Sequence, residues 1–170
     1  MSITIYLATK MTGKDRKEQV EHAQDIKEKF KQYDIVVVSP VLEEGVPALP
    51  GPLLNTDEVK LRGFWKRDKE IITREVHAVM IDGADQKSFG MEREYGLSRY
   101  CMWKPTVLYM PKTFLNVSQF EDDWVSDDLD EIGKYLQENF GTRQKRVLWR
   151  VKMLARSLPK WIVDQIYQFR

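Results

Sequence analysis

The best candidate for chemistry in this chain is Glu94, which lies in the segment SFGMEREYG at positions 88–96. The apolar run at 79–82 predicts a buried strand just before it, so a polar turn and a helix opened by Gly90 should follow. Ligands of α/β folds bind at such strand-to-helix turns, where the helix offers unpaired N–H groups. The helix start also favours the ionised form of Glu94. Such a carboxylate could be a nucleophile, or only a solvated charge that satisfies the helix dipole.

The elements that must position Glu94 follow from the apolar pattern. Apolar runs predict strands at 3–9, 34–39, 76–82 and 106–110. Helical spacing predicts helices at 14–32, within 58–74, at 90–103, from 126 or 127 to 140, and at about 144–157, with a short one starting at Pro159. This alternation predicts an α/β fold, flavodoxin-like or Rossmann-like, with a mainly parallel sheet flanked by helices. We expect an α/β domain at 1–141 and a C-terminal helical extension at 142–170.

Composition favours an ordinary soluble domain. The chain has 170 residues, of which 42% are hydrophobic and 31% are charged, so it can bury a core without disulfides. Its single cysteine, Cys101, excludes an internal disulfide and is expected to be a packed thiol, which favours a reducing compartment. Neither a signal peptide nor a long uncharged apolar stretch is visible. We therefore expect a cytoplasmic protein.

The extension is basic, although the whole chain has a net charge of only +1. Residues 141–170 contain eight Lys and Arg residues and a single acid, Asp164, so the rest of the chain is net negative. An apolar stripe at helical spacing runs beside these cations and consists of Val147, Leu148, Val151, Leu154 and Leu158. The extension could pack on its own domain or within a homo-oligomer. It could also contact an anionic membrane or nucleic acid.

Three segments together resemble the nucleoside 2-deoxyribosyltransferase superfamily. They are Gly90-x-x-x-Glu94-x-Gly96, the later Lys104-Pro105 and the opening Ile5-Tyr6-Leu7-Ala8. The superfamily includes nucleoside 5'-monophosphate N-glycosidases, whose signature is similar to Ser88-x-Gly90-Met91-x-x-Glu94. The resemblance covers about residues 3–110, and Asp68 precedes the glutamate as in the family.

The resemblance implies a role for several side chains. Glu94 would attack C1' of the sugar and displace the base, Asp68 would orient the sugar or supply a proton, and Tyr6 would hydrogen-bond the nucleophile from the end of the first strand. From the residues alone, Asp68 could instead be a surface charge and Tyr6 a core side chain. Trp65, on the same predicted helix face as Asp68, and Gly90, at the helix opening, are candidate substrate-binding residues.

A 5'-phosphate is a further candidate ligand. Ser88 matches a serine that binds this phosphate in the monophosphate glycosidases. The loop with Thr9, Lys10 and Gly13 offers hydroxyl, N–H and cationic groups for the same anion, although an ordinary polar loop has a similar composition. It is not a P-loop, because Ala8 stands where the first glycine is needed.

Two functions follow from this sequence. The first is an enzyme that cleaves the N-glycosidic bond of a 2'-deoxynucleoside or its 5'-monophosphate and passes the sugar to water or another base. The alternative is a non-catalytic nucleotide-binding sensor on the same fold, because Glu92 and Arg93 depart from the small or apolar residues usual in the family. We expect no cofactor and no metal, since His22 and His77 with one cysteine form no ligand pattern.

Overall fold

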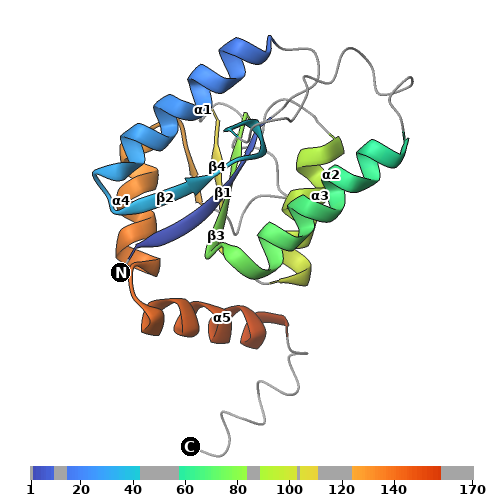
Figure 1. The fold of residues 1–170 in the computed structure, drawn as a ribbon. Coiled ribbons are helices and arrows are strands. Elements are labelled where there is room, and N and C mark those ends of the chain that lie inside the picture. The colour runs from blue at the N-terminus through green and yellow to red at the C-terminus, as the bar shows by residue number, and fades with distance from the viewer. Residues whose placement is uncertain are drawn as a thin grey trace, which may run out of the picture.

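A five-stranded parallel sheet with helices on both faces forms the body of the protein (Figure 1). The computed structural model describes residues 2–9, 15–42, 58–83, 89–102, 104–110 and 124–157. The strand order is β2-β1-β3-β4-β5, and every neighbouring pair is parallel. This is the doubly wound order, in which the strand order reverses between β1 and β3, so the predicted flavodoxin-like or Rossmann-like α/β fold is confirmed.

The central strands are apolar along their length because helices cover both faces of the sheet. Their bounds are β1 Ile3–Thr9, β2 Ile35–Val38, β3 Ala78–Asp82, β4 Thr106–Tyr109 and β5 Trp124–Ser126. The first four agree with the predicted strands to within two residues. The fifth was not predicted, because it has only three residues and lies in an acidic stretch that gave no apolar run.

All the helices except the last cover one or the other face of the sheet (Figure 1). Their bounds are α1 Arg16–Lys31, α2 Glu58–Glu70, α3 Phe89–Gly96, α4 Leu129–Phe140 and α5 Arg143–Ser157. Side chains of α1 and α4 share one core cluster with Ile3, Ile5 and Leu7 of β1. The other cluster contains Tyr6 and Ala8 of β1 together with Met91 of α3. Alternate residues of β1 therefore face opposite layers.

Two helices change their hydrogen-bond pattern where the prediction had one continuous helix. A π-helical turn, Ile71–Glu75, follows α2, and another, Leu97–Cys101, follows α3. The side chain of Asp128 caps α4 by accepting a hydrogen bond from the Asp130 N–H at 2.7 Å. The helix therefore starts later than the predicted cap at Ser126 or Asp127, and it ends at Gly141 as expected.

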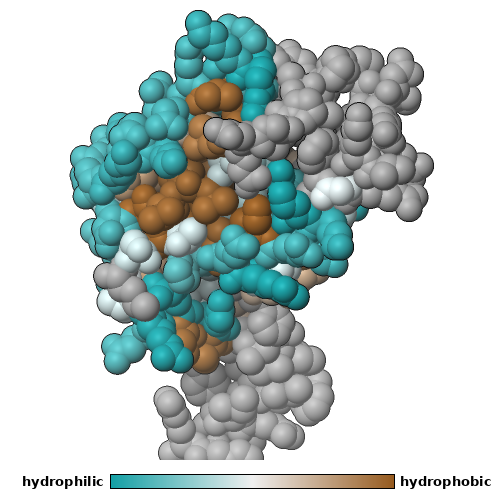
Figure 2. Space-filling model, in the orientation of Figure 1, coloured by the Kyte–Doolittle hydropathy of each residue, from teal (hydrophilic) through white to brown (hydrophobic). Residues whose placement is uncertain are grey.

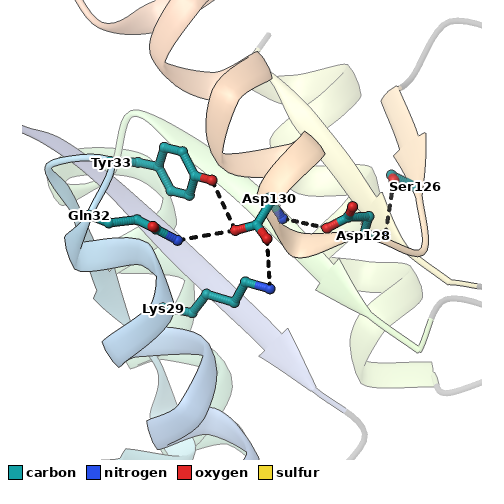
Figure 3. A network of polar contacts seen from close by, with 6 residues as sticks. All are labelled: Lys29, Gln32, Tyr33, Ser126, Asp128 and Asp130. Carbon is teal, nitrogen blue, oxygen red and sulfur yellow. Dashed lines mark hydrogen bonds and ion pairs between the residues drawn. The ribbon is translucent and has the colours of Figure 1, made fainter.

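A polar network joins α1 to the start of α4 (Figure 3). The Asp130 carboxylate accepts hydrogen bonds from the Tyr33 hydroxyl at 2.9 Å and from the Gln32 amide at 3.1 Å. Its other oxygen lies 3.1 Å from Nζ of Lys29. These contacts lower the pKa of Asp130, chiefly through Lys29 and then through Tyr33. They hold the two helices of this face side by side, on the face opposite to Glu94.

Helix α5 follows α4 and lies at the end of the molecule, beyond the amino ends of the strands (Figure 1). It packs on the body through Trp149, whose ring meets that of Phe140 edge-on at 5.8 Å. Arg146 donates a hydrogen bond to the Phe140 carbonyl at 2.8 Å. None of the helices in the described part of the chain is long and apolar enough to cross a bilayer. The division into 1–141 and 142–170 stays a prediction.

Candidate active site

The sheet brings Glu94 and Tyr6 together, although 88 positions separate them in the sequence. Tyr6 lies in β1 and faces the layer of α2 and α3, and Glu94 projects toward it from α3. The Tyr6 hydroxyl donates a hydrogen bond to Oε1 of Glu94 at 2.7 Å. Glu94 is only 9% exposed and Tyr6 is fully buried, so the alternative of a solvated glutamate is wrong.

Burial decides the charge of Glu94. It raises the pKa of this carboxyl to about 8, the Tyr6 hydrogen bond acts in the opposite direction, and the nearby negative charge of Asp68 raises it further. Glu94 is therefore mostly neutral at pH 7, and the expectation of an ionised side chain is wrong. The helix start favours the anion only within the first turn. Because α3 begins at Phe89, Glu94 already lies in the second turn.

Tyr6 is suited to remain a donor. Burial, followed by the charges of Glu94 and Asp68, raises the pKa of its hydroxyl well above the ordinary value. The hydroxyl therefore keeps its proton at any physiological pH. It lies in the middle of β1, where it pairs with Val38 and Val79, and not at the strand's end as the sequence suggested. Its backbone is held between two neighbouring strands and its ring is packed in the layer below α3, so its hydroxyl is held rigidly against Glu94.

Asp68 reaches the same site from α2. Its charge acts on both Glu94 and Tyr6, which places the carboxylate within electrostatic range of the pair. The neighbouring Arg67 holds it with Nη2 3.0 Å from Oδ1, and the Asp68 side chain is only 14% exposed. Asp68 is thus a largely buried, positioned carboxylate, which excludes the alternative of a plain surface charge.

Trp65 also lies near this group, one helical turn before Asp68. The guanidinium carbon of Arg93 lies 4.3 Å from the centre of its ring, a cation–π arrangement. Arg93 directly precedes Glu94 and is exposed. Arg93 thus links α3 to the Trp65 ring of α2, while Arg67 pairs with Asp68.

Thr9 does not join this group. It ends β1 and pairs in register with Asp82, the last residue of β3. By the alternation of β1, Thr9 shares the face of Ile5 and Leu7, which is the face covered by α1. Its hydroxyl is buried and makes no hydrogen bond within the described residues. Thr9 therefore lies at the carboxyl ends of the strands, as expected, but on the face of the sheet opposite to Glu94.

A histidine and an aspartate form a pair at the carboxyl ends of the strands, and the sequence analysis did not predict this pair. Nε2 of His22, in α1, lies 2.9 Å from Oδ2 of Asp82. The two side chains are 48% and 12% exposed. Sequence spacing could not reveal the pair, because the contact depends on how α1 packs over the ends of β1 and β3.

Other predicted site residues lie outside the described parts of the chain. Ser88, Lys10 and Gly13 are among them, and Gly90 is described only as part of the backbone of α3. Their contribution to a phosphate site stays a prediction. Among the described residues, no group of three or more His, Cys, Asp or Glu side chains could hold a metal ion. Cys101 is exposed, so the expected packed thiol is wrong.

Lys104 and His77 make structural contacts at the other end of the sheet, near the amino ends of the strands. Nζ of Lys104 is buried and donates hydrogen bonds to the carbonyls of Val76 at 2.5 Å and Thr73 at 3.3 Å. Nδ1 of His77 accepts a hydrogen bond from the Thr4 N–H at 2.9 Å. Burial lowers the pKa of both side chains, that of Lys104 to about 8. Both side chains tie the loops before β3 and β4 to the sheet.

The chain matches no protein-family profile and no curated protein sequence. Its fold is similar to a solved structure of a 2-deoxyribosyltransferase from the bacterium Bacillus psychrosaccharolyticus. The TM-score is 0.57 at 21% sequence identity, and the match covers 78% of this chain and 91% of the other. The likeness therefore concerns nearly the whole of that protein, and it shows a common fold.

Proposed function

We propose that this chain cleaves the N-glycosidic bond of a 2'-deoxynucleoside or its 5'-monophosphate with Glu94 as the nucleophile. The observation that carries the proposal is the buried Glu94 carboxyl, hydrogen-bonded by Tyr6 and within electrostatic range of Asp68. Burying a carboxyl group costs free energy, so such groups are kept mainly where a function needs them. Carboxyl groups with a shifted pKa therefore cluster at functional sites. The fold shared with a 2-deoxyribosyltransferase, described as a biocatalyst for nucleoside synthesis, supports the same reaction class.

The geometry indicates which oxygen would react. Oε1 of Glu94 accepts the Tyr6 hydrogen bond, so the proton of the neutral acid belongs on Oε2. Loss of that proton frees an electron pair on Oε2, which attacks C1' while the C1'–N bond breaks and its electron pair leaves with the base. The Asp68 carboxylate or solvent accepts the proton that Glu94 loses, and the departing nitrogen takes a proton from the same group. Tyr6 keeps the carboxylate fixed throughout.

The second half of the reaction returns the enzyme to its starting state. Water, or a nitrogen of another base, attacks C1' of the glycosyl ester from the face that the first base left, and the C1'–Oε2 bond breaks. The electron pair returns to Glu94, and the proton that the attacking group loses passes to Glu94 through Asp68 or solvent, which restores the neutral acid. Two displacements at C1' retain the sugar configuration. Hydrolysis and base exchange differ only in the second attacking group.

The proposal is tested with a panel of nucleosides and 5'-monophosphates. Release of free base is followed by chromatography with and without a second base, and Glu94→Gln is the matched variant. We expect base release by the wild type and none by the variant, because the amide cannot carry the attacking electron pair. Substantial release by the Gln variant would exclude Glu94 as the nucleophile.

One observation favours the sensor as a second candidate. Glu94 is mostly neutral at pH 7, and a neutral acid can donate a hydrogen bond to a nucleobase but cannot attack C1'. A sensor would bind nucleotides measurably by calorimetry and release no base at any pH from 6 to 9. An enzyme would release base increasingly as the pH rises toward 8, because the ionised fraction of Glu94 grows.

A further inference from the structure

Helix α5 turns an apolar surface away from the protein. Val147, Leu148 and Val151 are 51%, 56% and 55% exposed, although aliphatic side chains of a globular domain are usually buried. Trp149 lies two positions from each valine, a rotation of about 200° along a helix. Since Trp149 packs on the body, the two valines must point away from it. Leu154 and Leu158, which continue the predicted stripe, lie outside the described side chains.

Cations border this apolar surface on both sides. At about 100° per residue, Arg143 and Arg150 follow one edge of the stripe and Lys145 and Lys152 the other. All four side chains are exposed. The helix contains no Asp or Glu, so no residue of α5 neutralises them. We define the α5 outer face as these four cations with Val147, Leu148 and Val151.

The α5 outer face is accessible at one end of the molecule. Figure 1 shows α5 beyond the amino ends of the strands, and Figure 2 shows hydrophobic residues at the surface there among hydrophilic ones. A larger hydrophobic area in Figure 2 lies over the β2 side of the sheet, where Val36 is 47% exposed. The site around Glu94 is formed by β1, α2 and α3, so a partner on the α5 outer face would not occupy that site.

We propose that the α5 outer face docks on an anionic lipid surface, with the helix lying in the plane of the headgroups. An aliphatic stripe bordered by Lys and Arg is the pattern of helices that lie at a lipid interface, because the stripe enters the acyl boundary while both edges meet anionic headgroups. A flat anionic surface can pair with the cations on both sides of the stripe at the same time. This proposal is independent of the reaction at Glu94.

Other occupants fit this face less well. A second copy of the same face would bring eight cations together, and lysine is depleted at the centre of protein interfaces. Nucleic acid phosphates would pair with the cations, but they would leave the aliphatic stripe in water. The combination of aliphatic and cationic side chains therefore favours lipid.

The test uses the full chain and flotation with vesicles of phosphatidylcholine, with and without phosphatidylserine. We expect binding only to the anionic vesicles, and weaker binding at high salt. The double variant Leu148→Glu with Val151→Glu should lose this binding. Val36→Glu is the matched control, because it places the same charge at a similarly exposed valine of β2, outside the α5 outer face, and should bind as the wild type does.

A second variant tests the cationic edges. Lys145→Ala with Lys152→Ala should weaken vesicle binding by about 20- to 30-fold, since each lysine at an anionic surface contributes roughly a factor of five. Circular dichroism establishes that all variants are folded. Absence of binding to the anionic vesicles overturns the proposal, as does binding that Leu148→Glu with Val151→Glu leaves unchanged. If the same pair of substitutions turns a dimer into a monomer, the occupant is a second copy. Duplex DNA binding that depends on the lysines alone assigns the face to nucleic acid.

Discussion

Replacing Glu94 by Gln should change how the stability of this protein depends on pH. In the wild type, burial raises the pKa of Glu94 in the folded state to about 8, whereas the unfolded chain keeps a value near 4.5. Below pH 4.5 both states hold the proton. Between pH 4.5 and pH 8 only the unfolded state loses it, so ionisation stabilises the unfolded chain and the free energy of unfolding falls as the pH rises.

The magnitude follows from the two pKa values. Each pH unit crossed within this window lowers the free energy of unfolding by up to about 1.4 kcal/mol. Near its lower end the unfolded carboxyl is only partly ionised, so the loss from pH 5 to pH 7 is about 2–3 kcal/mol. The amide of the Glu94→Gln variant cannot ionise in either state, and this loss should disappear. The stability of the variant relative to the wild type should therefore rise by that amount over the same interval.

Urea unfolding followed by tryptophan fluorescence at pH 5, 6, 7 and 8 measures both proteins under identical conditions. The exposed Glu138 in α4 provides the control, because Glu138→Gln removes one carboxylate without touching the site. Its stability curve should run nearly parallel to that of the wild type. Parallel curves for Glu94→Gln and the wild type would refute the reasoning, since they would mean that the folded state leaves Glu94 ionised.

Three further substitutions test other parts of the structure. Tyr6→Phe removes the hydrogen bond that lowers the pKa of Glu94, so the rise of kcat/KM with pH should move to higher pH; base release measured from pH 6 to 9 checks this. Ser88→Ala should raise KM about 10- to 100-fold for 5'-monophosphates and leave nucleosides nearly unaffected, which initial rates on both substrates would show. Gly133→Ala would drive a methyl group into the ring of Tyr33 and should lower the free energy of unfolding by about 1–3 kcal/mol in urea.

The sequence predicted the elements that carry a strong apolar signal. The runs that became β1, β2, β3 and β4 are continuous because both faces of a parallel sheet are buried, and this pattern is local. The short β5 has no such run, since Trp124 at its start is 39% exposed and stacks on Tyr135 of α4. Only the packing of α4 reveals that this segment belongs to the sheet.

The charge of Glu94 could not be predicted from its position along the chain. The sequence places Glu94 near a helix start, but the start of α3 at Phe89 puts Glu94 in the second turn, and its burial depends on segments from other parts of the sequence. The electrostatic effect of Asp68 on the Glu94–Tyr6 pair is tertiary in the same way. The resemblance to a family named these three residues, and the structure shows that they are neighbours.

The separation of 88 positions between Tyr6 and Glu94 has a consequence for folding. β1 lies between β2 and β3, and its pairing with β3 must close a long loop that contains α1, β2 and α2. No fragment that ends before α3 contains the pair, so a growing chain cannot assemble the site early. Recovery of the pair after denaturation should therefore coincide with completion of the whole sheet. A probe on Tyr6 would report global refolding and not a local event.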